Sequence, residues 1–464
     1  MKVKSHMSET TNRRRPRIAL WFRYGPGDHA QLFSALPDLL RRLAEKADVH
    51  YFGLRGAPAA GGVIPPGVTV HELPFSVRRA DGRDKWIKTL LWLALLPWLG
   101  LRCRRMGIEL IFMDETLPLS TRLARVFYRG HVITMVADFF LTIYGETQPW
   151  LRLPARWINA LDLRAWRRLP LLFTKTETAR RYLIERGAAP EKVVVTYNPC
   201  DLERYRPRDR AEARRRFGFD PTDYVAVHHG ILHPNKGNDF LLRSLAPILR
   251  EQPRVKLLLI GDGPEMPILR RLARELDVES QIRLTGWLPA LEDVSWGLNA
   301  ADVGLVMRRG QFSDHFHVTD TLAHNLACGL PVLAARLGGM EEIVGGADVG
   351  ELFDPTDADD LRDKFTALMN DPARRARQAA AARRRAETCF ARDDIARRTA
   401  AALLNLLSED VSAFYCGDDH PSTNRAAELP PSVGWNPCSS GAPSPENVKS
   451  TSKMKLDETA RPER

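Results

Sequence analysis

The sequence predicts an α/β fold with two Rossmann-like parallel-sheet domains, and two stretches carry this prediction. Residues 18–24 are a run that is apolar except for Arg23 and that passes through a Gly25-Pro-Gly27 turn into leucines at helical spacing. A strand, a glycine turn and a helix in this order open a parallel α/β domain. The same order begins again at Tyr224, where residues 225–228 precede a glycine-containing loop and a helical segment at 239–249. A length of 464 residues suits two large domains with tails.

Further apolar runs predict the remaining strands of the first domain. They occupy residues 49–54, 68–75, 109–113, 131–136, 171–175 and 193–197. Thr176 stands where an N-cap is expected before a helix at 177–186. We therefore expect an N-terminal domain at 17–205, preceded by a disordered basic segment at 1–16.

The second half of the chain predicts another parallel sheet. Its strands are expected at 225–228, 255–260, 282–284, 303–306 and 331–334, where Val, Ile and Leu run nearly without interruption. A helix is expected to end at Gly329, and a buried strand, the pair Gly338-Gly339 and another helix follow it. In this arrangement backbone N–H groups can face an anion. We expect a C-terminal domain at 206–390, a last helix at 391–407, and a disordered tail at 408–464 rich in Pro, Ser and Gly.

Charge and cysteine usage limit the expected partners and compartment. The net charge is +11 and the pI is near 9.5, which favours anionic partners such as phosphate-bearing substrates or acidic lipid surfaces. Many arginines are mixed with Asp and Glu, and no zinc-ligand spacing or basic–aromatic platform is evident, so we expect no nucleic-acid partner. Six scattered cysteines and a polar, basic start without a secretory core indicate a cytoplasmic location.

Residues 86–101 predict an unusual helix. The segment has no charge after Lys88, holds three tryptophans and has basic residues on both flanks. It is too short to cross a bilayer. Two interpretations stay open: a core helix buried on both faces, and a helix that docks at a membrane interface, where Trp and basic residues are both favoured.

The chain carries several motifs in a recognisable order. They are His229-Gly230 through Lys236-Gly237, the loops Gly261-Asp262-Gly263 and Gly286-Trp287, and AHNLACGLPVLAARLGGMEEIV at 323–344. With these motifs the chain resembles the family-4 nucleotide-sugar glycosyltransferases of GT-B fold, over residues 17–398. The resemblance implies two domains that face across a cleft, with the last helix returning to the first domain. It also implies a nucleoside-diphosphate sugar as co-substrate, no other cofactor, and transfer with retention.

Lys236 is the residue on which chemistry and resemblance agree. The donor releases a diphosphate of high negative charge, and a lysine on a glycine-flanked loop after a strand is suited to bind it. The resemblance assigns Lys236 this catalytic role. The family often adds an arginine at a position that Ile231 occupies here, and Arg308 or Arg309 is the expected replacement.

Other candidate donor-binding residues follow strands or open helices, where α/β sheets bind ligands. They are Gly230, Gly261, Asp262, Gly263, Trp287, Thr319, Asp320 and Thr321, together with Gly25 and Gly27 of the first domain. The resemblance places the nucleobase near Trp287 and the loop of Gly25 and Gly27 near the donor phosphate and acceptor. Glu342 is expected to act as a cap or to contact the donor.

The sequence departs from the resembled family at its usual acidic and histidine positions. Phe316 and His324 stand where paired carboxylates are usual, and the usual histidine before Asp138 is absent. Asp138 and Asp314 are therefore the candidate catalytic carboxylates on the sugar side, and His324 can still hydrogen-bond a ribose diol. A metal site at Asp314 and the neighbouring histidines is less favoured, because enzymes of this fold generally need no catalytic metal.

The expected function is a retaining hexosyltransferase of glycan biosynthesis. Its acceptor is expected to be a lipid-linked or cell-surface glycan, and the enzyme to be peripheral at the inner face of the plasma membrane. Two alternatives stay open. One is an inactive GT-B protein that binds a nucleotide sugar or a partner, which the substitutions favour, and the other is a sugar-nucleotide epimerase.

Overall fold

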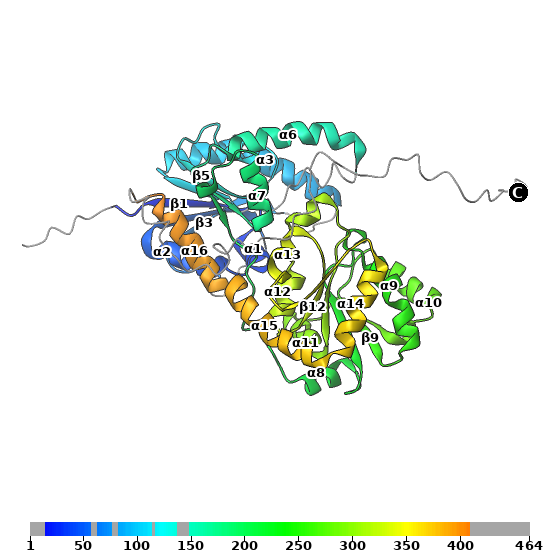
Figure 1. Ribbon diagram of the computed structural model, residues 1–464. Helices are drawn as coiled ribbons and strands as arrows, with labels where there is room; N and C mark the ends of the chain where they lie inside the picture. Colours follow the sequence, from blue (N-terminus) through cyan, green and yellow to red (C-terminus); the bar gives the residue numbers. More distant parts are fainter. Residues whose placement is uncertain (1–13, 57–62, 77–81, 114–116, 137–147, 409–464) are drawn as a thin grey trace, which may run out of the picture. The chain divides into compact units, whose positions relative to one another are not determined.

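The computed structural model describes residues 14–56, 63–76, 82–113, 117–136 and 148–408, which build two parallel sheets with surrounding helices (Figure 1). The N-terminal sheet has the order β3-β2-β1-β4-β5-β6-β7. Its strands are β1 (Arg17–Trp21), β2 (Asp48–Arg55), β3 (Val68–Ser76), β4 (Leu110–Met113), β5 (His131–Val136), β6 (Leu172–Thr174) and β7 (Val193–Val195). The helices of this domain are α1 (Pro26–Leu32), α2 (Leu36–Lys46), α3 (Gly82–Arg105), α4 (Ser120–Ala124), α6 (Arg152–Trp166) and α7 (Glu177–Glu185), with 3-10 turns η1 (Pro149–Leu151) and η2 (Pro190–Lys192).

The C-terminal sheet has the order β10-β9-β8-β11-β12-β13. Its strands are β8 (Tyr224–His229), β9 (Val255–Ile260), β10 (Ile282–Leu284), β11 (Val303–Val306), β12 (Val332–Ala335) and β13 (Gly350–Phe353). Its helices are α8 (Arg210–Phe217), α9 (Asn238–Glu251), α10 (Met266–Glu275), α11 (Leu291–Ala300), α12 (Asp320–Ala327), α13 (Gly338–Val344), α14 (Ala358–Asn370) and α15 (Pro372–Phe390). The 3-10 turns η3 (Pro234–Lys236), η4 (Glu279–Gln281) and η5 (Phe312–Phe316) lie between them, and α16 (Arg392–Asn405) follows α15.

Both sheets reverse their strand order at the first strand. Ile18 of β1 pairs in register with Val49 and with Leu110, and Ala226 of β8 pairs with Leu257 and Val303, all in parallel. A first strand lying between the second and the fourth is the Rossmann arrangement. The predicted fold class, with two Rossmann-like parallel-sheet domains, is confirmed.

The sequence prediction missed several details of the elements. The first strand stops at Trp21, and the buried Arg23 instead donates a hydrogen bond to the Thr89 hydroxyl of α3 at 2.7 Å. The short strand β13 and the helices α4, α6, α10, α11 and α14 were not predicted. The Gly338-Gly339 pair is not a turn, because it forms the first residues of α13.

Helix α3 corrects one of the two interpretations of residues 86–101. Thr89, Trp92, Leu96 and Leu99 recur at helical spacing and are buried, so this face packs into the domain core. The other face is apolar but exposed, since 47% of Trp98 is accessible to solvent. Burial on both faces is therefore wrong. No helix within the described residues is long and apolar enough to cross a membrane.

The last helix packs on the N-terminal domain. Helix α16 contacts α2, and Arg42 of α2 forms an ion pair with Asp393 at 2.6 Å. Helix α15 packs on α12 of the C-terminal domain, where the Arg383 guanidinium donates to the carbonyl of Ala327 at 2.8 Å. The end of the described chain thus contacts both sheet domains.

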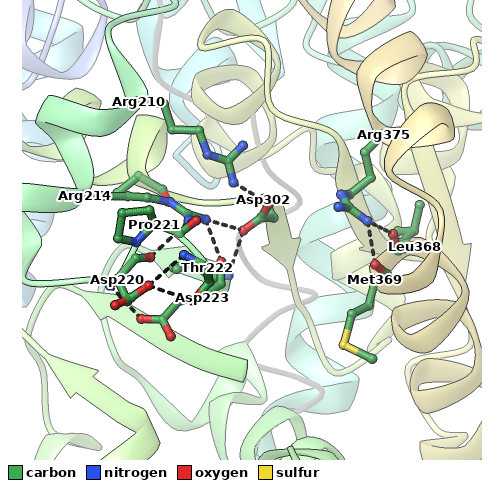
Figure 2. Close-up of polar contacts among 12 residues, drawn as sticks. Arg210, Arg214, Asp220, Pro221, Thr222, Asp223, Asp302, Leu368, Met369 and Arg375 are labelled. Carbon is green, nitrogen blue, oxygen red and sulfur yellow. Dashed lines mark hydrogen bonds and ion pairs between the residues drawn. The ribbon is translucent and has the colours of Figure 1, made fainter. Parts of the chain in front are cut away.

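A buried ion pair fixes the amino ends of the central C-terminal strands (Figure 2). Arg214 of α8 donates to the Asp302 carboxylate at 2.8 Å, and the same carboxylate oxygen accepts the Val225 N–H at 2.8 Å. Arg214 also donates to the carbonyls of Asp220 and Asp223. Because Asp302 precedes β11 and Val225 lies in β8, this network locks these two strands at the end opposite their carboxyl termini.

Candidate functional site

The candidate site lies where the C-terminal sheet reverses its order, beyond the carboxyl ends of β8 and β11. Ligands of open α/β sheets bind at this point because the two connections leave in opposite directions and open a crevice. The chain leaves β8 through Gly230 and leaves β11 through Arg308, Arg309 and Gly310. Both glycines have positive φ, 133° and 81°, which L side chains adopt at a cost.

Lys236 is the last residue of the short η3 turn, in the loop that connects β8 to α9. Its side chain is half-buried, and the next residue, Gly237, has φ of 73° and starts α9. The left-handed backbone conformation at position 237 favours glycine, which explains why a glycine follows Lys236. The pKa of the neighbouring His228 is lowered to about 4, mainly by burial; the hydrogen bond to the Leu305 carbonyl opposes this shift and the charge of Lys236 contributes to it. Lys236 therefore carries its charge close to the end of β8.

Arg309 holds the Lys236 loop from β11. Its Nε donates to the carbonyl of Pro234, and its guanidinium forms an ion pair with Asp239, so it binds the chain on both sides of Lys236. Burial acts to raise the pKa of Asp239, but the hydrogen bond from Arg309 and further contacts outweigh it and lower the pKa. The sequence predicted Arg308 or Arg309 as the replacement for the arginine missing at Ile231, and of these two the structure brings Arg309 to the Lys236 loop.

Close backbone contacts shape the neighbouring loop. A Cβ atom on Gly261 would lie 2.0 Å from the carbonyl oxygen of Gly230, and one on Gly263 would lie 2.2 Å from that of Leu232. Leu232 in turn donates its N–H to the carbonyl of Asp262 at 2.9 Å. The predicted residues Gly230, Gly261, Asp262 and Gly263 thus lie together. Their glycines are required because two backbone segments approach each other without room for side chains.

Trp287 stands on the exposed part of this region. It follows β10 and Gly286, and 62% of its surface is accessible. The Gly261 N–H donates to the Gly286 carbonyl at 3.0 Å, so the Trp287 loop is tied to the Gly261 loop. A large exposed aromatic ring beside such loops can stack on a planar ligand.

The start of α12 faces the same strand end. The Thr319 hydroxyl accepts the Leu322 N–H at 3.2 Å as N-cap, and the Thr321 hydroxyl donates to the carbonyl of His229 at 3.0 Å. Asp320 is exposed and accepts a hydrogen bond from Asn198 at 3.1 Å. Helix α12 therefore directs its positive dipole end toward the carboxyl end of β8.

Three stacked rings lie under this strand end. His324 of α12 stacks on Tyr205 at 3.7 Å between ring centroids and on His229 at 5.2 Å. Burial lowers the pKa of His324 to about 4 and that of His229 well below its ordinary value. Both rings are therefore neutral at physiological pH. His324 Nδ1 and His229 Nε2 are buried and have no hydrogen-bond partner among the described residues.

Asp314 lies in a buried ion pair. Its carboxylate contacts the Arg308 guanidinium at 3.1 Å and accepts the N–H of Gln311, the N-cap of η5, at 3.1 Å. Asp314 and Arg308 thereby neutralise each other, so Arg308 is not placed as the second cation of the donor site. Phe316, two residues later, packs edge-on against Tyr182 of α7 with ring centroids 5.0 Å apart.

Glu342 caps a helix of the N-terminal domain. Its carboxylate accepts the N–H groups of Glu177 and Thr178 at 3.1 and 2.9 Å and the Thr178 hydroxyl at 3.2 Å, all at the start of α7. Burial raises the pKa of Glu342 to about 7, and these hydrogen bonds oppose the rise. Gly338 adjoins the same helix, because a Cβ there would lie 2.7 Å from Thr178. The N–H groups of Gly338, Met340 and Glu341 at the start of α13 already donate to His315 Nδ1 or to the Leu337 carbonyl, which corrects the expectation that they face an anion at the glycine pair.

The remaining predicted residues lie in the N-terminal domain. Gly25 is the N-cap of α1 and Gly27 lies in its first turn. A Cβ on Gly25 would lie 3.0 Å from the Leu54 carbonyl oxygen, so this loop packs closely on the end of β2. Asp138 lies outside the described residues.

A pocket at the opposite end of the C-terminal sheet is not a competing ligand site. It measures about 370 Å³ and is lined by Arg210, Asp302 and Arg375, among others. Figure 2 shows that two of its arginines are engaged: Arg210 binds Asp302, and Arg375 donates to the carbonyls of Leu368 and Met369. Among the described residues, no group of three or more His, Cys, Asp or Glu side chains is arranged to hold a metal ion.

The structure adds residues that sequence reasoning missed. Asp239 anchors Arg309, and Tyr205 and His229 form the ring stack with His324. The signal for Asp239 was present, because an acid in the first turn of a helix two residues after Lys236-Gly237 lies beside that loop. No local pattern marks Tyr205, which comes from the connection between the two sheets.

Part of the chain is similar in sequence to known proteins. Residues 209–385 match the family model described as Glycosyl transferases group 1. D-inositol 3-phosphate glycosyltransferase of Rhodococcus jostii is 32% identical over 224 residues, 47% of this chain and 48% of that protein. A GDP-mannose-dependent monoacylated alpha-(1-6)-phosphatidylinositol monomannoside mannosyltransferase of Corynebacterium glutamicum is 31% identical over 47% of this chain and 57% of its own length. The chain thus spans about half the length of the curated relatives it matches.

Solved structures extend the similarity to both domains. Sucrose-phosphate synthase of Thermosynechococcus elongatus superposes with a TM-score of 0.67 at 19% identity, covering 85% of this chain and 99% of that one. Anabaena HepE in complex with UDP superposes with a TM-score of 0.61 at 20% identity, covering 84% and 100%. The chain therefore has the fold of the GT-B glycosyltransferases, and its residues 209–385 match the group 1 glycosyl transferase family.

Proposed function

We propose that this protein is a family-4-type glycosyltransferase that moves a hexosyl sugar from a nucleoside-diphosphate donor to a hydroxyl acceptor with retention. One observation carries the proposal: Lys236, whose loop Arg309 holds, lies where the strand order of a Rossmann sheet reverses. The close backbone contact of Gly230 with Gly261 and the exposed ring of Trp287 belong to the same region. The match of residues 209–385 to group 1 glycosyl transferases supports this assignment.

The cations of the site would stabilise the leaving diphosphate. The bond between the anomeric carbon of the sugar and the phosphate oxygen breaks, and a bond to the acceptor oxygen forms in its place. The acceptor hydroxyl gives its proton to a phosphate oxygen of the departing nucleoside diphosphate, on which negative charge develops. Lys236 would bind that charge, Arg309 would hold the Lys236 loop in place, and the start of α12 would add its helix dipole. Such groups accelerate transfer because their interaction is stronger in the transition state than in the bound donor.

The rest of the site would bind the nucleoside and the sugar. Trp287 would stack on the base, and neutral His324 would hydrogen-bond ribose hydroxyls in place of the usual carboxylate. Asp138 is proposed for the sugar side. Asp314 is proposed to act there through Arg308, since its carboxylate is already paired. No cofactor other than the nucleotide sugar is required by this scheme.

The names of similar proteins support the donor and acceptor classes. Anabaena HepE was solved with UDP, and the Corynebacterium relative is named for GDP-mannose and a phosphatidylinositol monomannoside. We propose a lipid-linked or cell-surface glycan acceptor and a peripheral position at the cytoplasmic face of the plasma membrane.

Nucleotide release tests the proposal. The full-length protein is incubated with UDP-, GDP- and ADP-sugars, with and without lipid-linked acceptors, and release of the nucleoside diphosphate is followed. We expect acceptor-dependent release from one donor, strongly reduced in Lys236→Ala. Binding of a nucleotide without any release would favour the inactive alternative, and absence of binding to every donor would refute the assignment.

A further inference from the structure

The N-terminal domain carries an exposed apolar surface that the transfer reaction does not use. On α3, Ile87, Leu90, Leu91 and Trp98 recur at intervals of three, four and seven residues and are all exposed. Trp92 lies on the opposite, buried face, with 3% of its surface accessible. The exposed residues form one continuous apolar stripe, where a surface helix of a globular protein normally has polar side chains.

Two further segments of the same domain also expose large apolar side chains. Val126 and Phe127, just after α4, are exposed, and so are Trp150, Leu153 and Trp157 of η1 and α6. Trp157 has 74% of its surface accessible. Positions 150, 153 and 157 are spaced three and four residues apart, so these side chains share one helical face. We call the exposed apolar residues of α3, α4 and η1–α6 together the α3–α6 surface.

Specific contacts hold these segments together. Helix α3 contacts α4, and a Cβ on Gly100 would lie 2.7 Å from the carbonyl oxygen of Ala124, so the two helices approach at backbone distance. Helix α4 contacts α6, whose Asp162 carboxylate accepts the N–H of Leu119 at 3.0 and 3.1 Å. Figure 1 shows α3 and α6 in the same part of the N-terminal domain. The apolar groups are therefore presented by a built scaffold.

The same elements are strongly basic. Residues 89–113, 117–136 and 148–168 contain eleven arginines, against two acidic residues, Glu109 and Asp162. Asp162 is buried, whereas Arg122, Arg125 and Arg156 are exposed beside the apolar side chains. This charge disfavours the α3–α6 surface of a second copy as its partner, because like charges would face each other. It favours a surface that is apolar within and negatively charged at its boundary.

We propose that the α3–α6 surface docks on an anionic lipid bilayer. The leucines and Phe127 would enter the acyl boundary, the tryptophans would lie at headgroup level, and the arginines would bind lipid phosphates. The docking rests on this surface alone. Its use for reaching a lipid-linked acceptor rests on the proposed function.

Vesicle flotation of the full-length protein tests the docking. We expect recovery with phosphatidylcholine vesicles that contain phosphatidylglycerol, much lower recovery with phosphatidylcholine alone, and release by raised salt. Leu90→Glu with Trp98→Glu should abolish flotation. Arg122→Gln with Arg125→Gln should weaken it about 25-fold, since each basic residue near an anionic surface raises partitioning about fivefold. Leu153→Glu with Trp157→Glu provides a second apolar variant if the first fails to fold.

A matched control separates docking from a general loss of surface apolarity. Ile268→Glu with Leu291→Glu changes two exposed apolar residues of the C-terminal domain and should leave flotation unchanged. Flotation needs no sugar donor, so a failed transfer assay would leave the docking proposal standing. The α3 variant should still bind nucleotide. The proposal is overturned if the wild type stays unbound, if folded α3 and α6 variants float like the wild type, or if sedimentation shows a dimer that the α3 variant abolishes.

Discussion

Replacement of Lys236 by alanine is the most direct test of the donor site. Lys236 is half-buried, and Arg309 binds the chain on both sides of it, so the loop backbone is held independently of the Lys236 side chain. Ile231, at the position where an arginine would assist, is apolar and exposed. The variant should therefore fold normally and lose one cation without compensation. A charge-assisted hydrogen bond to phosphate contributes about 1.5–3 kcal/mol, which corresponds to an increase in Kd of about 10–150-fold.

Calorimetric titration with UDP and GDP measures this loss. Lys256→Ala is the matched control, because Lys256 is also half-buried but lies near the amino end of β9, about 13 Å along the strand from its carboxyl end. It should leave the affinity within about twofold of the wild type, since a charge at that distance is largely screened. Unchanged affinity in Lys236→Ala, or an equal loss in both variants, would show that Lys236 does not bind the diphosphate.

Three further substitutions test how the site is held. Asp314→Asn leaves the buried Arg308 without its counter-charge. It should therefore lower the free energy of unfolding, measured by urea titration, by about 3 kcal/mol. A loss of turnover at unchanged stability would contradict this. Because the pKa of Glu342 is raised from 4.5 to about 7, the folded state holds a proton that the unfolded state releases, so this residue makes stability fall as pH rises between these values. Thermal unfolding of Glu342→Gln should lack that part of the pH dependence, and equal pH profiles would refute it. Gly261→Ala should lower the free energy of unfolding by about 2 kcal/mol or more and weaken nucleotide binding, because its Cβ would lie 2.0 Å from a carbonyl oxygen. Its control, Gly286→Ala, has φ of 72° but open space around the Cβ, and should lower the free energy of unfolding by only about 1 kcal/mol.

Parts of the site followed from local sequence because local chemistry sets them. Three strands have the predicted bounds: Val255–Ile260, Ile282–Leu284 and Val303–Val306. Short apolar runs between turn residues are typical of buried parallel strands. The left-handed backbone at Gly237 and the close approach at Gly261 likewise depend on residues that lack a Cβ. Because parallel strands end at one edge of their sheet, the glycine loops, Lys236 and Trp287 were brought into one region by the fold class itself.

Side-chain partners could not be predicted in this way. Asp314 was a candidate for contacts with the sugar, and Glu342 for a cap or a donor contact. In the structure Asp314 pairs with Arg308, and Glu342 caps α7 of the other sheet domain. Glu342 and Thr178 are 164 residues apart, and no local pattern states which helix start will approach a given carboxylate. The same holds for α3, whose composition was equally consistent with burial and exposure.

The sequence by itself determined the class of fold, the strand positions and the residues that can bind a diphosphate, because hydrophobic period, backbone freedom and charge are properties of short segments. Only the tertiary structure decided which of those charges are already neutralised. It showed that Trp92 of α3 belongs to the core while Trp98 faces outward. It also showed that Arg308 forms an ion pair with Asp314, whereas Arg309 binds the loop of Lys236. Burial and ion pairing depend on atoms that meet only when the chain has folded, and these contacts distinguish a functional charge from a structural one.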